Sequence, residues 1–167
     1  MNDSRALDPT ILREYDIRGV VGETLTTDDV RTIGRAFGSM LRDDGGKTAA
    51  VGFDGRLSSP DLEAALTDGL VACGLKVFRV GLGPSPMLYF AAHKLKADAG
   101  LMITGSHNPP EFNGIKMTFQ GKPFYGGQIQ ELGRRAAAGD FIDGRGKARK
   151  RNVINDYVKR LIEEVKS

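Results

Sequence analysis

The sequence contains few of the residues that several classes of protein depend on. Its 167 residues include one cysteine, Cys73, which excludes an internal disulfide and a cysteine zinc site and favours a reducing compartment, the cytoplasm. Only two histidines, His93 and His107, are present, so a histidine-rich metal centre is not expected. No apolar run approaches the roughly 18 residues that cross a membrane, and the N-terminus lacks the apolar stretch of a signal peptide. We therefore expect no membrane partner.

A large charge of one sign is also missing, because 24 Lys and Arg oppose 21 Asp and Glu, a net charge of +3. The densest cationic cluster, between Arg145 and Arg151, contains no aromatic side chain on which a base could stack. We interpret it as a solvated loop and expect no nucleic-acid partner. The apolar content of 40% and the length are those of one globular domain.

Apolar residues recur with strand and helix periods in alternation, separated by many of the 22 glycines. This alternation predicts a three-layer α/β/α domain over residues 1–150 with a mostly parallel, mixed sheet, followed by a helix in 151–167. The expected strands are 12–17, 48–53, 76–80, 98–103 and 115–119, with a hairpin or edge strand near 124. The expected helices begin near 28, 59, 85, 128 and 153.

Side chains near these helix ends suggest local roles. Thr26 or Thr27 is expected to cap the first helix, Ser58 or Ser59 the second, and Asn152 the last. Cys73 is expected in the core and His93 on the surface. Arg56 and Ser58 are expected either to hold or cap the start of the second helix or to support a functional site.

Function in such sheets gathers in loops at the carboxyl ends of the strands. Three loops qualify: 18–19, 54–59 and 104–114. In the third, Ser106 lies between Gly105 and His107, and Asn108-Pro109-Pro110 follows, so a stiff loop would present a hydroxyl as a nucleophile. The same residue types are common in turns, and composition alone favours a plain turn.

Three segments together carry a resemblance to a known family. The stretch TGSHNPPEFNGIK at 104–116 resembles the active-site serine loop of the α-D-phosphohexomutases. YDIRG at 15–19 and GFDGRLS at 52–58 resemble two further motifs of that family, in the same order. The YDIRGVVG start and the Thr-Gly before SHNP resemble most the bacterial phosphomannomutase/phosphoglucomutase branch.

The resemblance implies that Ser106 carries a phosphoryl group and exchanges it with a hexose phosphate through a bound hexose 1,6-bisphosphate. It further implies Arg18 and Lys116 as cations for phosphate, and His107 and Lys116 as candidates for proton transfer. Tyr15 and Asn108 would contact substrate, and Mg²⁺ would bind an oxygen of the phosphate on Ser106.

Complete members of the family have four domains, and their aspartate-rich metal loop lies in the second. This sequence contains no Asp-Gly-Asp triplet, so the resemblance covers the first domain and a linker helix. We therefore expect partners in the remaining domains of the same enzyme and little activity from 1–167 alone. A phosphoglucosamine mutase domain, or a non-catalytic module that binds a phosphosugar or a partner protein, remains an alternative. The apolar stripe of the last helix is expected to fold onto the sheet, pair with a copy, or pack on a following domain.

Overall fold

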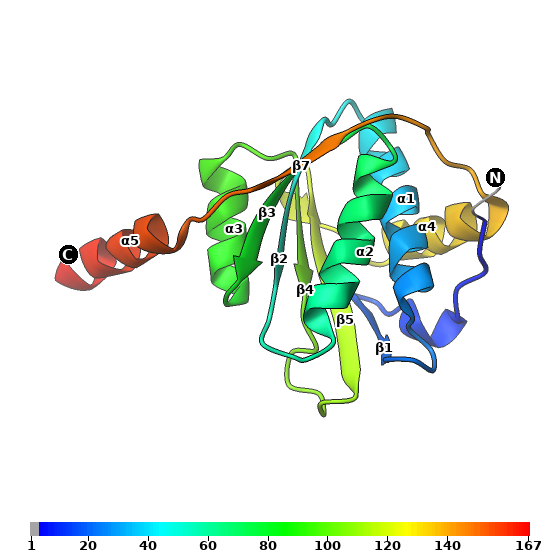
Figure 1. Cartoon of the computed structure of the whole chain (residues 1–167), viewed down its shortest axis with the longest axis horizontal. Coiled ribbons are helices and arrows are strands. Elements are labelled where there is room, and N and C mark those ends of the chain that lie inside the picture. Colours follow the sequence, from blue (N-terminus) through cyan, green and yellow to red (C-terminus); the bar gives the residue numbers. More distant parts are fainter. Residues whose placement is uncertain (1–3) are drawn as a thin grey trace.

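A seven-stranded mixed sheet between two layers of helices forms the body of the protein in a computed structural model, which describes residues 4–167 (Figure 1). The strands are β1 (Ile17–Val20), β2 (Thr48–Phe53), β3 (Lys76–Leu82), β4 (Ala99–Ile103), β5 (Phe112–Phe119), β6 (Lys122–Pro123) and β7 (Lys147–Lys150). The helices are α1 (Thr27–Asp43), α2 (Ser59–Val71), α3 (Ser85–Lys94), α4 (Gly127–Ala138) and α5 (Ile154–Lys166). The three-layer prediction is confirmed.

The sheet order is β1-β5-β4-β2-β3-β7, and β6 pairs with the carboxyl end of β5. Strands β4, β2, β3 and β7 run parallel to one another, whereas β5 is antiparallel to β4, β1 and β6. The carboxyl ends of β2 and β4 therefore meet at one edge of the sheet, as predicted for the loops that follow them.

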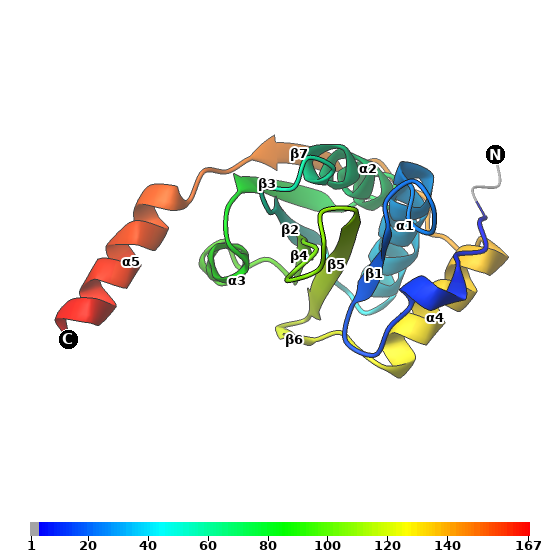
Figure 2. The same ribbon diagram turned by 90° about the horizontal axis from the view of Figure 1, so that it is seen from below.

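Two apolar cores flank the sheet. The larger one packs α1, α2 and α4 against one face, and the smaller one packs α3 against the other (Figure 2). Alternation along β2 produces this division, because Ala49 and Val51 belong to the first core and Ala50 to the second. Cys73 is fully buried, as predicted, and burial raises the pKa of its thiol.

The helix boundaries follow their predicted signals closely. Thr26 caps α1 through a reciprocal capping box with Asp29, and Gly139 ends α4 in a left-handed conformation. The second helix differs, because the Ser58 side chain makes no capping hydrogen bond and the Ser59 hydroxyl donates to Asp54 instead. At the start of α5, the Asn152 side chain accepts from the amide of Ile154.

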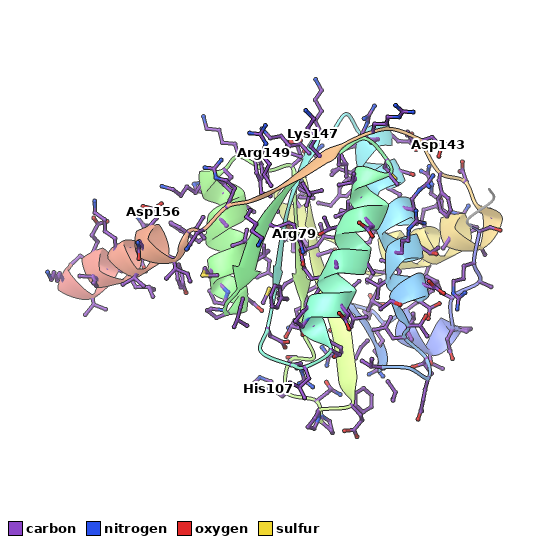
Figure 3. The ribbon with its side chains drawn as sticks, in the orientation of Figure 1. Arg79, His107, Asp143, Lys147, Arg149 and Asp156 are labelled. Atoms are coloured by element: carbon purple, nitrogen blue, oxygen red, sulfur yellow. The ribbon has the colours of Figure 1, made fainter. Side chains whose placement is uncertain are left out.

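Two predictions about the strands are wrong. The first strand begins at Ile17 and not at Leu12, because Pro9–Ile11 forms a 3₁₀ turn that buries Ile11. The cluster from Arg145 to Arg151 is not a loop throughout, since Lys147–Lys150 forms the edge strand β7 along β3. Its side chains are nevertheless exposed (Figure 3).

Helix α5 extends away from the body of the protein and does not fold back over the sheet (Figure 1). Its first turn contacts α3, where Tyr157 lies 5.5 Å from Phe90 between ring centroids. The side chains of Ile154, Val158, Leu161, Ile162 and Val165 are exposed. No helix within residues 4–167 is long and apolar enough to cross a membrane.

Candidate active site

Ser106 lies in the loop between β4 and β5, directly after the buried carboxyl end of β4. Its backbone adopts φ = 56°, in the left-handed region that side chains other than glycine rarely occupy. The Ser106 amide donates to the Thr104 hydroxyl at 3.0 Å, which closes a tight turn. The side chain is half-buried, and the following His107 is exposed at the tip of the loop (Figure 3). A local conformation of this kind persists only where the surrounding structure holds it.

Asp54, in the loop after β2, supplies part of that hold. Its carboxylate accepts hydrogen bonds from the Gly105 amide at 3.2 Å, the Ser59 hydroxyl at 2.6 Å and the Arg56 amide at 3.2 Å. Partial burial opposes ionisation, but these donors, with the Thr104 hydroxyl, outweigh it and hold the pKa of Asp54 below its ordinary value. Asp54 therefore stabilises the loop as a carboxylate.

Because the pKa of Asp54 is lowered, the loss of stability in the Asp54→Asn variant should depend on pH. A group whose pKa is depressed by folding stabilises the protein above its ordinary pKa of about 3.9 and loses that effect as the pH falls through the folded value. At pH 7 the variant is expected to lose about 1–2 kcal/mol of unfolding free energy, measured by urea titration. The difference from wild type should shrink as the pH is lowered below about 4. A difference independent of pH would contradict this assignment.

Arg56, from the same loop, reaches across to the serine loop. Its Nη1 donates to the carbonyl oxygens of Pro109 at 2.6 Å and Phe112 at 3.0 Å, and its Nη2 donates to those of Ser106 at 3.1 Å and Asn108 at 2.7 Å. The supporting role is thus the one that the contacts bear out. A Cβ on Gly105 would lie 2.2 Å from Arg56 Cζ, so the glycine leaves the room that the guanidinium occupies.

Arg18, on β1, joins the site from the other side. Its Nη1 donates to Asn108 Oδ1 and its Nη2 to Asp16 Oδ2, while its buried Nε has no hydrogen-bond partner among the described residues. Arg18 pairs in register with Gly114 on β5, where a Cβ would lie 2.0 Å from the Ile17 carbonyl oxygen. This close approach of backbones brings Arg18 to the serine loop.

Lys116 and Tyr15 lie together in a neighbouring cavity of about 540 Å³. Asp16, which pairs with Arg18, also lines this cavity and so connects it to the serine loop. Tyr15 is 75% exposed and stacks on Tyr125 with 6.1 Å between ring centroids. Within residues 4–167, the side chains of Lys116 and His107 make no hydrogen bond or ion pair, so the structure does not join them to Ser106.

Two further tyrosines line the same cavity, and sequence reasoning missed both. Tyr125 follows the short strand β6, and Tyr89 lies on α3, where burial raises the pKa of its hydroxyl. The proximity of Tyr15 and Tyr125 arises only from the folded arrangement, since the two residues lie far apart in the sequence. No pattern in the sequence indicates it.

No group of three or more His, Cys, Asp or Glu side chains suited to a metal ion occurs in the described part of the chain. A phosphate on Ser106 would itself supply an oxygen ligand, and divalent cations such as Mg²⁺ bind readily through substrate phosphates and water.

Comparison with known proteins places this geometry in a family. Residues 9–143 match the family profile described as phosphoglucomutase/phosphomannomutase, α/β/α domain I. The chain is 44% identical over 159 residues to a phosphomannomutase/phosphoglucomutase of Pseudomonas aeruginosa and 41% identical over 158 residues to a phosphoglucomutase of Neisseria gonorrhoeae. These matches cover 95% and 93% of the chain but 34% of each relative, so the chain spans about a third of their length.

A solved structure agrees with the sequence comparison. The crystal structure of a phosphoglucomutase/phosphomannomutase family protein from Burkholderia thailandensis superimposes with a TM-score of 0.90 at 44% identity. The superposition covers 94% of this chain and 36% of that one. The serine loop and the three-layer fold around it thus have the sequence and shape of a known domain, and the chain belongs to the phosphoglucomutase/phosphomannomutase family.

Proposed function

We propose that this chain is the serine-bearing domain of a phosphohexomutase that interconverts the 1-phosphate and 6-phosphate of mannose or glucose. The observation that carries the proposal is Ser106 itself. Its hydroxyl lies on a loop held in a left-handed turn by Asp54 and Arg56, with the Arg18 guanidinium alongside. The names of the relatives support the same activity.

The proposed reaction is two phosphoryl transfers through Ser106. A hydroxyl of the hexose phosphate attacks the phosphorus of phosphorylated Ser106, and the bond from phosphorus to Ser106 Oγ breaks as the bond to the sugar oxygen forms. The sugar hydroxyl gives up its proton and Ser106 Oγ regains one, so a bound hexose 1,6-bisphosphate results. After the sugar turns over, Ser106 takes the other phosphoryl group by the reverse step.

The site residues have distinct proposed roles in this reaction. Arg18 keeps a second hydrogen on each Nη for a phosphate oxygen, because its bonds to Asn108 and Asp16 use one hydrogen of each Nη. Lys116 supplies a second cation from the adjacent cavity, where Tyr15 would contact the sugar. His107 or Lys116 would exchange the proton with the sugar hydroxyl. Asn108 would contact the substrate while oriented by Arg18.

Mg²⁺ belongs to the proposal as a ligand of the phosphate on Ser106. When bound, it would neutralise charge on the phosphoryl oxygens. Phosphoryl transfer depends mainly on positioning and charge neutralisation, and the residues of this domain supply the first of these at Ser106. The remaining magnesium ligands would come from another domain.

The domain division follows the same proposal. Residues 1–150 would form the serine domain, and 151–167 would form the linker helix toward the other domains of the enzyme. The exposed apolar side chains of α5 accord with packing against a following domain. The proposed compartment is the cytoplasm, in keeping with a single cysteine that is buried.

Intact mass tests the role of Ser106. Chain 1–167 incubated with glucose 1,6-bisphosphate is expected to gain about 80 Da, the mass of one phosphoryl group, localised to Ser106 by fragmentation. The Ser106→Ala variant should gain nothing. Ser85→Ala, a change at the first residue of α3, serves as the matched control and should be phosphorylated like wild type.

The outcomes also separate the alternatives. A wild-type chain that takes no phosphoryl group would favour the non-catalytic module that binds a phosphosugar or a partner protein. Substrate competition between glucose and glucosamine phosphates in a complete protein that contains this domain would decide on the phosphoglucosamine mutase alternative.

Turnover by the isolated chain is a separate expectation. Because this domain completes neither a magnesium site nor, by our proposal, the sugar-binding surface, purified 1–167 should convert glucose 1-phosphate at a negligible rate. A coupled assay for glucose 6-phosphate measures this rate. Conversion at a rate comparable to that of a four-domain relative would refute the proposal that other domains supply the magnesium ligands and the sugar-binding surface.

A further inference from the structure

We propose that Arg56 is a positioning residue, which sets the backbone of the serine loop and takes no part in binding phosphate. The inference deepens the proposed function, since it rests on Ser106 as the phosphoryl carrier. It runs against the usual expectation for an arginine close to a phosphorylated serine, because guanidinium groups commonly bind phosphate directly.

Four of the five donors of Arg56 bind the serine loop, and the fifth faces a carboxylate. A guanidinium has five N–H groups, two on each Nη and one on Nε. The four Nη hydrogens are matched by four carbonyl oxygens of the serine loop, those of residues 106, 108, 109 and 112. Nε lies 3.4 Å from Asp54 Oδ2, and the side chain is only 15% exposed. A phosphate oxygen could bind Arg56 only by displacing part of the loop.

Arg18 provides the contrast within the same site. Two of its nitrogens hold Asn108 and Asp16, but its Nε has no partner among the residues that the structure describes. The two arginines therefore differ. Arg18 uses one hydrogen on each Nη and keeps the second ones for an anion, whereas Arg56 directs its four Nη hydrogens to the backbone and its Nε toward Asp54.

The loop requires an external donor because of its own sequence. Pro109 and Pro110 lack amide hydrogens, and the left-handed turn at Ser106 interrupts regular pairing between backbone groups. Four carbonyl oxygens converge on one point, where they would repel one another without a cation between them. The guanidinium also forms an ion pair with Asp54, whose carboxylate accepts a hydrogen bond from the Gly105 amide. Together the two side chains fix the backbone on both sides of Ser106.

Hydrogen exchange tests the positioning role without reference to catalysis. In Arg56→Ala, the amides of Gly105 and Asn108 are expected to exchange at least about tenfold faster than in wild type. The amides of β2 and β4 should keep their rates, as should all amides in Arg160→Ala, a control on the exposed face of α5. Arg56→Lys, which keeps the charge but lacks the planar set of donors, should show the same loop effect. Unchanged loop exchange in a folded Arg56→Ala or Arg56→Lys protein would overturn the proposal.

Phosphorylation kinetics test the claim that Arg56 does not bind phosphate. With glucose 1,6-bisphosphate, Arg56→Ala should lower the maximum rate of Ser106 phosphorylation but change the half-saturating concentration by less than about twofold. Millimolar ethylguanidinium should restore part of the rate and the loop protection in this variant. Arg18→Lys should instead raise the half-saturating concentration. A raised half-saturating concentration with an unchanged maximum rate in Arg56→Ala would identify Arg56 as a phosphate ligand and overturn the proposal.

The two experiments also separate this inference from the proposed function. If the wild-type chain takes no phosphoryl group, the proposed function fails, and hydrogen exchange still decides whether Arg56 holds the loop.

Discussion

Replacing Arg79 with leucine is expected to lower the free energy of unfolding by about 3 kcal/mol, the lower end of the range for breaking a buried ion pair. Arg79 on β3 donates through Nε and Nη2 to the two carboxylate oxygens of Glu63 on α2, at 2.9 and 2.7 Å. The Glu63 side chain is 3% exposed, whereas that of Arg79 is 35% exposed, and access of water to Arg79 places the loss at this lower end. The variant would leave the Glu63 carboxylate buried, with the Thr67 hydroxyl as its one side-chain hydrogen-bond partner within residues 4–167.

A double variant separates the free-energy cost of leaving the Glu63 carboxylate unpaired from the net contribution of the ion pair to stability. Glu63→Met combined with Arg79→Leu should recover most of the loss, to within about 1 kcal/mol of wild type, because apolar replacements of a buried pair are often neutral. Arg160→Ala breaks an exposed pair with Glu164 and should cost less than about 1 kcal/mol. Urea titration of the four proteins measures these values. If the single Arg79→Leu variant is as stable as wild type, the Glu63 carboxylate is hydrated in that variant and the prediction is wrong.

Gly69→Ala is expected to cost about 2 kcal/mol, because it forces α1 and α2 apart. An added Cβ would lie 2.2 Å from the Arg31 carbonyl oxygen and 2.9 Å from the Arg35 amide nitrogen, both backbone atoms of α1. Backbone cannot move aside as a flexible side chain can. Overpacking typically costs about 1–3 kcal/mol, and the higher helix propensity of alanine returns no more than about 1 kcal/mol, so the clash should dominate.

The control for this prediction lies in another helix. Gly127 in α4 has no atom within 4 Å of an added Cβ, so Gly127→Ala should leave the midpoint of urea unfolding unchanged or slightly higher. Equal midpoints for Gly69→Ala and Gly127→Ala would contradict the close helix contact.

Those features that depend on neighbours along the chain could be predicted from the sequence. The start of α1 follows from a threonine cap and an aspartate three residues later, which bond each other locally. The buried face of α4 follows from the spacing of Ile129, Leu132 and Ala136. The position of Ser106 at the end of β4 followed in the same way from an apolar strand and the loop after it.

Features formed by distant backbone contacts could not be predicted in this way. Strand β7 is charged and exposed. Gly146, just before it, lets the chain approach Leu75 closely at the start of β3, since a Cβ there would lie 1.9 Å from the Leu75 carbonyl oxygen. The partners of Arg56 are main-chain carbonyls about fifty residues further on, and any loop sequence carries such groups. The pattern of side chains therefore contained no information on what Arg56 would bind.

The left-handed backbone at Ser106 places stability and chemistry in competition at one residue. Any side chain there carries a conformational cost of about 1–2 kcal/mol, which glycine would avoid. Selection for a more stable domain alone would thus replace the serine, whereas selection for the phosphoryl transfer that we propose would keep it. On our proposal for Ser106, stabilising contacts elsewhere in the domain, including the two apolar cores that flank the sheet, let the chain tolerate a strained nucleophile.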